Sequence, residues 1–370
     1  MRMSESTSAS APTGRVQPAP ASPAPVAAPS PASSPASSPA PAGASSPAAE
    51  PARRRSGGPG WFAARFAVLG VWLLLAVLYG LLRPDTFLTE GALRTIFGSQ
   101  QALVFLTASL LCTIIVGEFV DMSVASNFGL AAILVSVLYV NHGWNVWLAA
   151  LAAVLASVLV GLVNAWLVVR VGVNTIVVTL GMGTFLLGIA NWLADLAPVS
   201  GLPDSIEQFA RQPVLGLPIS FFYGLLLMLG FGYVLHVTPL GRSLRFVGES
   251  REVSRLAGVR VTRIRMGAFI CAGLFAGLGG VLAAGATGGF DPNVSQSYLL
   301  PIFAATFLGT AILQPGRFNP LGTLLAVYFL ATGVLGLQLL GATSWVSSVF
   351  YGGVLVVAVT LSTVLRNRAR

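Results

Sequence analysis

The stretch Gly241–Arg265, "GRSLRFVGESREVSRLAGVRVTRIR", lies between two long apolar segments and decides how the chain is organised. It holds seven arginines, whereas the whole chain has only 21 basic residues, all of them arginine. Cytoplasmic loops of membrane proteins collect basic residues, and the loops on the other side are poor in them. The stretch therefore predicts a cytoplasmic loop between two membrane spans.

The composition supports a membrane protein. The chain of 370 residues is 55% hydrophobic and 9% charged, and its mean hydropathy is +0.81. About 18 or more consecutive apolar residues indicate a membrane helix, because about 20 residues cross a hydrocarbon core of about 30 Å. We expect an all-α polytopic membrane protein with about ten transmembrane helices. The expected spans cover 62–82, 95–116, 122–140, 146–169, 174–196, 215–237, 263–285, 298–314, 319–340 and 345–365.

The arginines also predict the orientation of these spans. With the N-terminus inside and ten crossings, the outer side keeps only Arg83, Arg94 and Arg211. The other 18 arginines fall inside, and a shift by one span would invert this bias. The net charge of +9 and the pI near 10.5 therefore reflect membrane orientation and not a nucleic-acid partner. Both termini are predicted to be cytoplasmic.

Two regions differ in composition. Residues 1–60 are dominated by Pro, Ala and Ser and have too few large apolar groups to offset the entropy of ordering. We expect a disordered cytoplasmic tail there. Residues 61–370 form the predicted membrane domain, with its main cytoplasmic loop at 238–262.

Within that loop, "SREVSRLAG" predicts a short helix. Ser250 can accept a backbone N–H bond as the N-cap, and Glu252 in the first turn suits the helix dipole. Gly258 follows the last turn, where a left-handed residue is favoured. The loop is thus expected to carry a capped helix outside the membrane.

The predicted helix has two different faces. Val253 and Leu256 share one face with Ala257, while Arg251 and Arg255 lie four apart on another. Such a helix can lie on an anionic lipid surface. It can also place its apolar face in a groove of a cytoplasmic partner. The sequence alone leaves both uses open.

Several chemistries lack the residues they need. Without lysine there is neither a phosphate-binding P-loop lysine nor a Schiff-base lysine, so any ATP hydrolysis is expected on another chain. His142 and His236 are single and separated, so we expect neither a metal site nor catalytic residues. Cys112 and Cys271 lie in apolar runs and are interpreted as packing residues.

Polar residues near or within spans are candidates for a solute pathway. Glu118 and Asp121 lie three apart beside a span, where ionisable groups suggest function. A cytoplasmic turn with Asp121 capping the third span is the alternative. Neutral solutes suit weakly polar side chains, although interhelical hydrogen bonds explain such residues equally well. The candidate pathway residues are Asp121, Asn127, Asn174, Thr179 and Thr184.

Four segments resemble one family of transporters. "TPLGRSLRFVGESREVSRLAGVRVTRIRMGAFICAGLFAGLGGVL", "GEFVDMSVASNFGLAAIL", "NTIVVTLGMGTFLLGIA" and "FLGTAILQPGRFNPLGTLLAV" are similar, in this order, to segments of the permeases of ribose-type ABC importers. The likeness covers roughly residues 62–366. "YLLPIFAA" departs from it, since the family usually has an acidic residue there, and this leaves the identity of the solute open.

The resemblance implies a fold like that of the cobalamin importer permeases, in a bacterial inner membrane. It implies a second permease subunit, identical or different, and an extracytoplasmic solute-binding protein. It also implies a cytoplasmic ATPase that holds ATP and Mg²⁺, so that this chain binds no cofactor itself. The cargo would be a monosaccharide, ribose- or xylose-like, or a related small polar solute. The residues from Ser250 to Gly258 would couple the chain to the ATPase.

Two other classes compete with this interpretation. An ion-coupled secondary transporter predicts buried acids within spans, and only Glu118 and Asp121 come near that description. A membrane enzyme would need a cluster of His, Asp, Glu or Cys at one depth, and the sequence suggests none.

Overall fold

The computed structural model describes residues 59–118 and 120–369. Nearly all of the predicted disordered tail, residues 1–60, therefore lies outside the described residues. The rest is mostly helical. The membrane helices and their extensions are α1 Pro59–Leu82, α3 Glu90–Gly98, α4 Gln101–Ile115, α5 Ser123–Val140, α6 Val146–Ala165, the π-helix η1 Trp166–Val171, α7 Thr175–Leu193, α9 Ile219–Val237, α12 Val261–Thr287, α13 Val294–Ser297, α14 Leu299–Gly309, α15 Pro320–Leu339 and α16 Ser344–Ala369.

Seven helical segments in the described part of the chain are long and apolar enough to cross a membrane. They are Glu90–Ile115, Ser123–Val140, Val146–Val171, Thr175–Leu193, Ile219–Val237, Val261–Thr287 and Pro320–Leu339. Three shorter apolar stretches, Val68–Leu82, Val294–Gly309 and Trp345–Thr360, lie where the first, eighth and tenth spans were expected. The structure is therefore that of a polytopic helical membrane protein.

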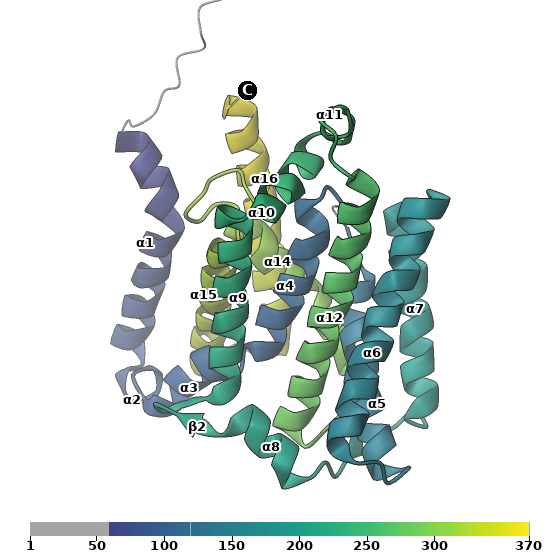
Figure 1. Ribbon diagram of the computed structural model, residues 1–370. Helices are drawn as coiled ribbons and strands as arrows, with labels where there is room; N and C mark the ends of the chain where they lie inside the picture. The colour runs from purple at the N-terminus through teal and green to yellow at the C-terminus, as the bar shows by residue number, and fades with distance from the viewer. Residues whose placement is uncertain (1–58, 119, 370) are drawn as a thin grey trace, which may run out of the picture. The chain divides into compact units, whose positions relative to one another are not determined.

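The connections separate the ends of the helices into two faces (Figure 1). Helices α10 Pro239–Glu249 and α11 Arg251–Leu256 lie at one end, together with the start of α1 and the end of α16. We call this end the α11 face. Helices α2 Pro84–Phe87 and α8 Asp204–Arg211 and strand β2 Pro213–Val214 lie at the other end, which we call the α8 face.

Short strands stabilise the α8 face. Strand β1 Val199–Ser200 pairs antiparallel with β4 Gly289–Phe290, which joins segments far apart in sequence. Strand β2 pairs with β3 Leu217–Pro218 in a tight hairpin. Neither these strands, of two residues each, nor α8, of eight residues, was predicted from the sequence, because elements this short contain no long apolar run.

Helix α12 packs at the centre of the described helices, against α4, α5 and α6. Its contact with α6 has almost no side chains between the two backbones. A Cβ added at Gly273 would lie 2.5 Å from the carbonyl oxygen of Ser157 and 3.3 Å from the Cα of Gly161. The Ser157 hydroxyl donates to the Gly273 carbonyl at 2.9 Å. Glycines at the interface thus let the two helix backbones approach closely.

Candidate coupling site at the α11 face

Helix α10 occupies most of the segment that was interpreted as the first half of a loop. Thr238 ends α9 and caps α10, because its hydroxyl accepts from the backbone N–H of Gly241 at 3.2 Å. Val247 is buried, and Gly248 packs directly against the backbone of Ile115 at the end of α4. Helix α10 therefore holds the start of α11 against the membrane helices.

Helix α11 has the local structure that its sequence predicts. The Ser250 side chain accepts from the backbone N–H of Val253 at 3.4 Å, and Glu252 lies in the first turn. Gly258, beyond the last turn, has a φ of +80°. These features fix both ends of the helix.

The apolar face of α11 is turned away from the protein. Leu256 is 85% exposed and Val253 is 50% exposed, whereas Ser254 on the other side is buried. Arg255 is exposed and makes no ion pair within the described residues. The helix thus presents two exposed apolar side chains and, within the part of the chain that the structure describes, an arginine without an ion-pair partner.

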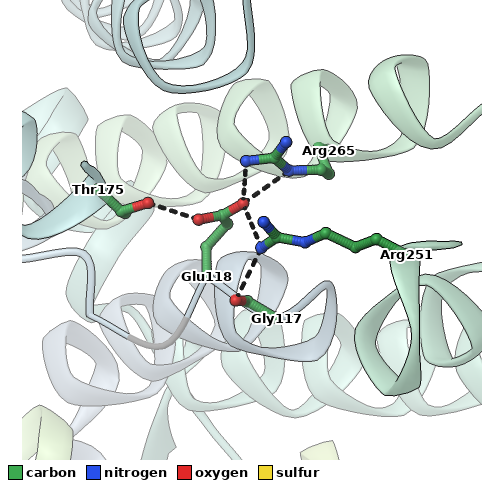
Figure 2. A network of polar contacts seen from close by, with 5 residues as sticks. All are labelled: Gly117, Glu118, Thr175, Arg251 and Arg265. Carbon is green, nitrogen blue, oxygen red and sulfur yellow. Dashed lines mark hydrogen bonds and ion pairs between the residues drawn. The ribbon is translucent and has the colours of Figure 1, made fainter. Parts of the chain in front are cut away.

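Glu118 links α11 to the membrane helices (Figure 2). Its carboxylate is 4% exposed, and Oε1 pairs with Nη2 of Arg251 at 2.8 Å and with Nη2 of Arg265 at 2.5 Å. The Nε of Arg265 also donates to Oε1 at 2.7 Å, and the Thr175 hydroxyl donates to Oε2 at 2.5 Å. Arg251 donates in addition to the carbonyl of Gly117 at 3.0 Å.

This network, which we call the Glu118 cluster (Gly117, Glu118, Thr175, Arg251 and Arg265), joins four elements. Glu118 follows α4, Thr175 begins α7, Arg251 begins α11, and Arg265 lies in the first turns of α12. A nearly buried carboxylate is stable only when it is paired and hydrogen-bonded, and both conditions are met here. The cluster therefore connects the start of α11 to the starts of α7 and α12.

Asp121 lies in the same turn between α4 and α5. It is 3% exposed, and burial raises the pKa of its carboxyl to about 6. The backbone N–H and the hydroxyl of Ser123 donate to Oδ1 at 3.1 and 2.7 Å and act in the opposite direction, while nearby Glu118 raises the pKa further. Asp121 thus accepts from Ser123 in the first turn of α5, although the N-cap residue of that helix is Met122 and not, as the turn interpretation expected, Asp121.

The other predicted pathway residues are dispersed. Thr179 is buried and bonds the segment before α5, with its hydroxyl accepting from the backbone N–H of Met122 at 3.2 Å. Asn127 is buried between α5 and α6 and donates to the Ser157 carbonyl at 3.2 Å.

Asn174 and Thr184 are exposed on α7. Asn174 caps that helix, since its Oδ1 accepts from the Ile176 N–H at 2.9 Å, and the Thr184 hydroxyl bonds the Leu180 carbonyl of its own helix. The structure therefore brings Asp121 and Thr179 together but leaves Asn174 and Thr184 outside that group. Glu118 was weighed from sequence only as an acid near a span, and its two arginine partners were not foreseen.

Comparison with known proteins agrees with this architecture. Residues 95–359 match the family described as "Branched-chain amino acid transport system / permease component". The chain is 31% identical over 293 residues to the autoinducer 2 import system permease protein LsrD of Escherichia coli strain K12, covering 75% of this chain and 88% of that protein. The LsrD protein of Shigella flexneri gives the same identity and coverage. No solved structure matches the chain.

The family match covers well over half of the chain, and the relatives are matched over most of their length. Both findings agree with the four segments that resemble ABC importer permeases and with the apolar helices. The chain therefore belongs to this family of ABC importer permeases, as a multi-pass transport subunit of the inner membrane.

Proposed function

We propose that this chain translocates a small polar, sugar-like solute, driven by ATP hydrolysis on a separate cytoplasmic ATPase. A ribose- or xylose-like monosaccharide and the autoinducer 2 of the relatives' name are the candidate cargoes. A second permease subunit, identical or different, and an extracytoplasmic solute-binding protein complete the importer. The observation that carries the proposal is the exposed apolar face of α11 beside the Glu118 cluster.

The proposed orientation places the α11 face in the cytoplasm, with both termini on that side and ten crossings of a fold like that of the cobalamin importer permeases. The support is the distribution of charge. The arginines of α10 and α11 lie at the α11 face, whereas Arg83 and Arg211 belong to the opposite face.

The ATPase is proposed to bind α11 in a groove. Leu256 at 85% exposure is unfavourable in water, and burying such a side chain contributes about 1.5–3 kcal/mol. Arg255 beside it would meet an acidic rim of the groove. When ATP binding draws the two ATPase subunits together, each α11 would move with its groove.

The Glu118 cluster would carry that movement into the membrane helices. Arg251 is fixed to Glu118, and Glu118 is fixed to Arg265 of α12 and Thr175 of α7. These contacts are short and polar, and they act at the helix ends that would have to move when access switches between the two sides of the membrane.

The test combines Arg255→Glu with Leu256→Asp, which reverses the charge and removes the apolar contact. We expect affinity for the co-expressed ATPase to fall at least tenfold to hundredfold, since about 1.5–3 kcal/mol is lost from Leu256 alone. The matched control is Arg83→Glu with Leu88→Asp, a similar pair that is exposed at the α8 face. The measurement is co-purification of the ATPase with a correctly inserted permease, together with ATP-dependent uptake in proteoliposomes.

Full retention of the ATPase by the α11 variant would exclude the docking role of this helix. Uptake driven by an ion gradient, with the ATPase omitted, would exclude the ABC mechanism and favour a secondary transporter.

A further inference from the structure

A groove of about 770 Å³ lies between the membrane helices α9 and α12. Helix α4 packs against both of these helices and forms the floor of the groove, where Phe105, Cys112 and Ile115 are buried (Figure 1). Leu226 on α9 is 71% exposed and Leu278 on α12 is 37% exposed, so the groove opens at the surface of the protein. Because both walls belong to helices that can cross a membrane, the opening faces lipid or a neighbouring membrane protein.

The body of the groove is apolar and as long as one leaflet of a bilayer is thick. Its lining on α12 extends from Arg263 to Leu278, about 22 Å along a helix axis. One half of a hydrocarbon core is about 15 Å thick. A Cβ added at Gly230 on α9 or at Gly267 on α12 would meet no atom within 4 Å, so the space in front of both glycines is open. An acyl chain that enters from the membrane can therefore lie along the groove.

One end of the groove carries a positive charge. Among the described residues that line it, Arg263 alone is charged, and its guanidinium forms no hydrogen bond or ion pair with the rest of the described chain. Arg265, two residues later, is held by Glu118, and residues two apart on a helix do not share a face. Leu240 and Leu244 of α10 line the same end. The groove therefore has an apolar body and a cationic end near the α11 face.

The charge around this end favours a lipid over a second copy of the chain. A second copy related by a two-fold axis would place the same stretch, Gly241–Arg265, against itself. That stretch has seven arginines and only Glu249 and Glu252 as acids, so two copies would repel each other. An anionic phospholipid offers the complementary features, a phosphate for Arg263 and acyl chains for the apolar body.

We propose that this groove binds an anionic phospholipid, with the phosphate on Arg263 and an acyl chain between α9 and α12. The lipid fills the space beside α10, the helix that leads into α11, and so supports the position of α11. The inference is independent of the solute and of the ATPase proposed above.

The first test measures lipid binding to the full-length, delipidated permease by native mass spectrometry. The probes are phosphatidylglycerol, which is anionic, and phosphatidylcholine with the same acyl chains, which is zwitterionic. We expect phosphatidylglycerol to bind about fivefold more tightly, the effect of one basic side chain near an anionic lipid. Arg263→Gln should remove this preference. Arg260→Gln is the matched control and should retain it, because Arg260 is exposed and lies outside the lining.

A substitution at Gly230 tests the apolar body in the same assay. The side chain of Gly230→Leu would enter the open groove and exclude two or more methylene groups of the acyl chain. The affinity for both lipids should therefore fall at least about tenfold. Gly70→Leu on α1 is the control, because Gly70 is also exposed with no atom within 4 Å of an added Cβ but lies outside the lining. It should leave both affinities unchanged.

The native thiol of Cys271 locates the bound lipid, because Cys271 is exposed and lines the groove. In the Cys112→Ala permease, phosphatidylglycerol at about ten times its dissociation constant should slow the reaction of this thiol with a small maleimide about elevenfold, as mass action requires. The control variant carries Thr184→Cys together with Cys112→Ala and Cys271→Ala. Position 184 is exposed on α7 and outside the lining, so its thiol should react at the same rate with and without the lipid.

Equal affinity of the unmodified permease for the two lipids would overturn the proposal, as would an equal loss of preference in Arg263→Gln and Arg260→Gln. Equal slowing of the two thiols would also overturn it, because the lipid would then cover the protein without a specific site. A disulfide that joins Cys271 of two permeases on oxidation, and that phosphatidylglycerol does not prevent, would assign the groove to a second copy of the chain instead.

Discussion

Glu118 should stabilise the protein mainly through Arg265 and only slightly through Arg251. The Glu118 carboxylate is 4% exposed, and the side chains of Arg265 and Arg251 are 16% and 44% exposed. Removing one partner of a buried ion pair costs about 3–5 kcal/mol, whereas an exposed pair contributes about 0.2–1 kcal/mol. The Glu118–Arg265 pair is close to the first case, and the Glu118–Arg251 pair is closer to the second.

The perturbation is Glu118→Gln, combined with Arg265→Gln and with Arg251→Gln in two double-mutant cycles. We expect Glu118→Gln alone to lower the free energy of unfolding by about 3 kcal/mol. The coupling energy should be about 2–3 kcal/mol with Arg265 and at most about 1 kcal/mol with Arg251. The assay is reversible unfolding in mixed detergent micelles.

A control comes from the α8 face, where Glu207 pairs with Arg211 in an exposed contact of 3.3 Å. Glu207→Gln should change the free energy of unfolding by about 0.5 kcal/mol or less. Additive effects of Glu118→Gln and Arg265→Gln, within about 0.5 kcal/mol, would refute the reasoning. Stronger coupling to Arg251 than to Arg265 would refute it as well, since burial would then not decide the energy.

Two further substitutions test the packing and the charge. The pKa of Asp121 rises on folding from 3.8 to about 6, so the ionised carboxyl destabilises the folded state increasingly from about pH 4 to about pH 6. Asp121→Asn should therefore raise the free energy of unfolding by up to about 3 kcal/mol at pH 8, and this gain should disappear as the pH falls toward 4. An equal gain at pH 4 and pH 8 would show that the buried charge of Asp121 is not the cause. Gly273→Ala should lower the free energy of unfolding by about 1–3 kcal/mol, because the added methyl group would clash with the backbone of α6. Gly267→Ala is the control on the same helix: its methyl group enters open space and should leave the free energy of unfolding unchanged.

The helices could be predicted from sequence because apolar length and charge placement are local signals. The predicted span 122–140 corresponds to α5 Ser123–Val140, and 319–340 corresponds to α15 Pro320–Leu339. The caps of α11 were equally local, since Ser250 and Gly258 act on neighbours three or four residues away. Helix α10 was missed because its few apolar residues do not form a run, and its support comes from the distant backbone of Ile115.

The candidate site was predicted only in part. The helix was found, but the Glu118 cluster was not, because Arg251 and Arg265 lie 133 and 147 residues from Glu118 in sequence. The sequence does not distinguish among the seven arginines of this stretch, and only the folded structure shows which two pair with the carboxylate of Glu118. The one available signal was a single acidic residue at the end of an apolar run.

The contact of α6 with α12 limits how this protein can move. Where the Cα atoms of Gly161 and Gly273 lie beside each other, the backbones of α6 and α12 pack directly against each other. Sliding one helix along the other would require them first to separate by the width of a side chain, which would break the bond from Ser157 to Gly273. The two helices are therefore expected to move as one unit, so that a displacement reaching α12 through Arg265 would shift α6 with it.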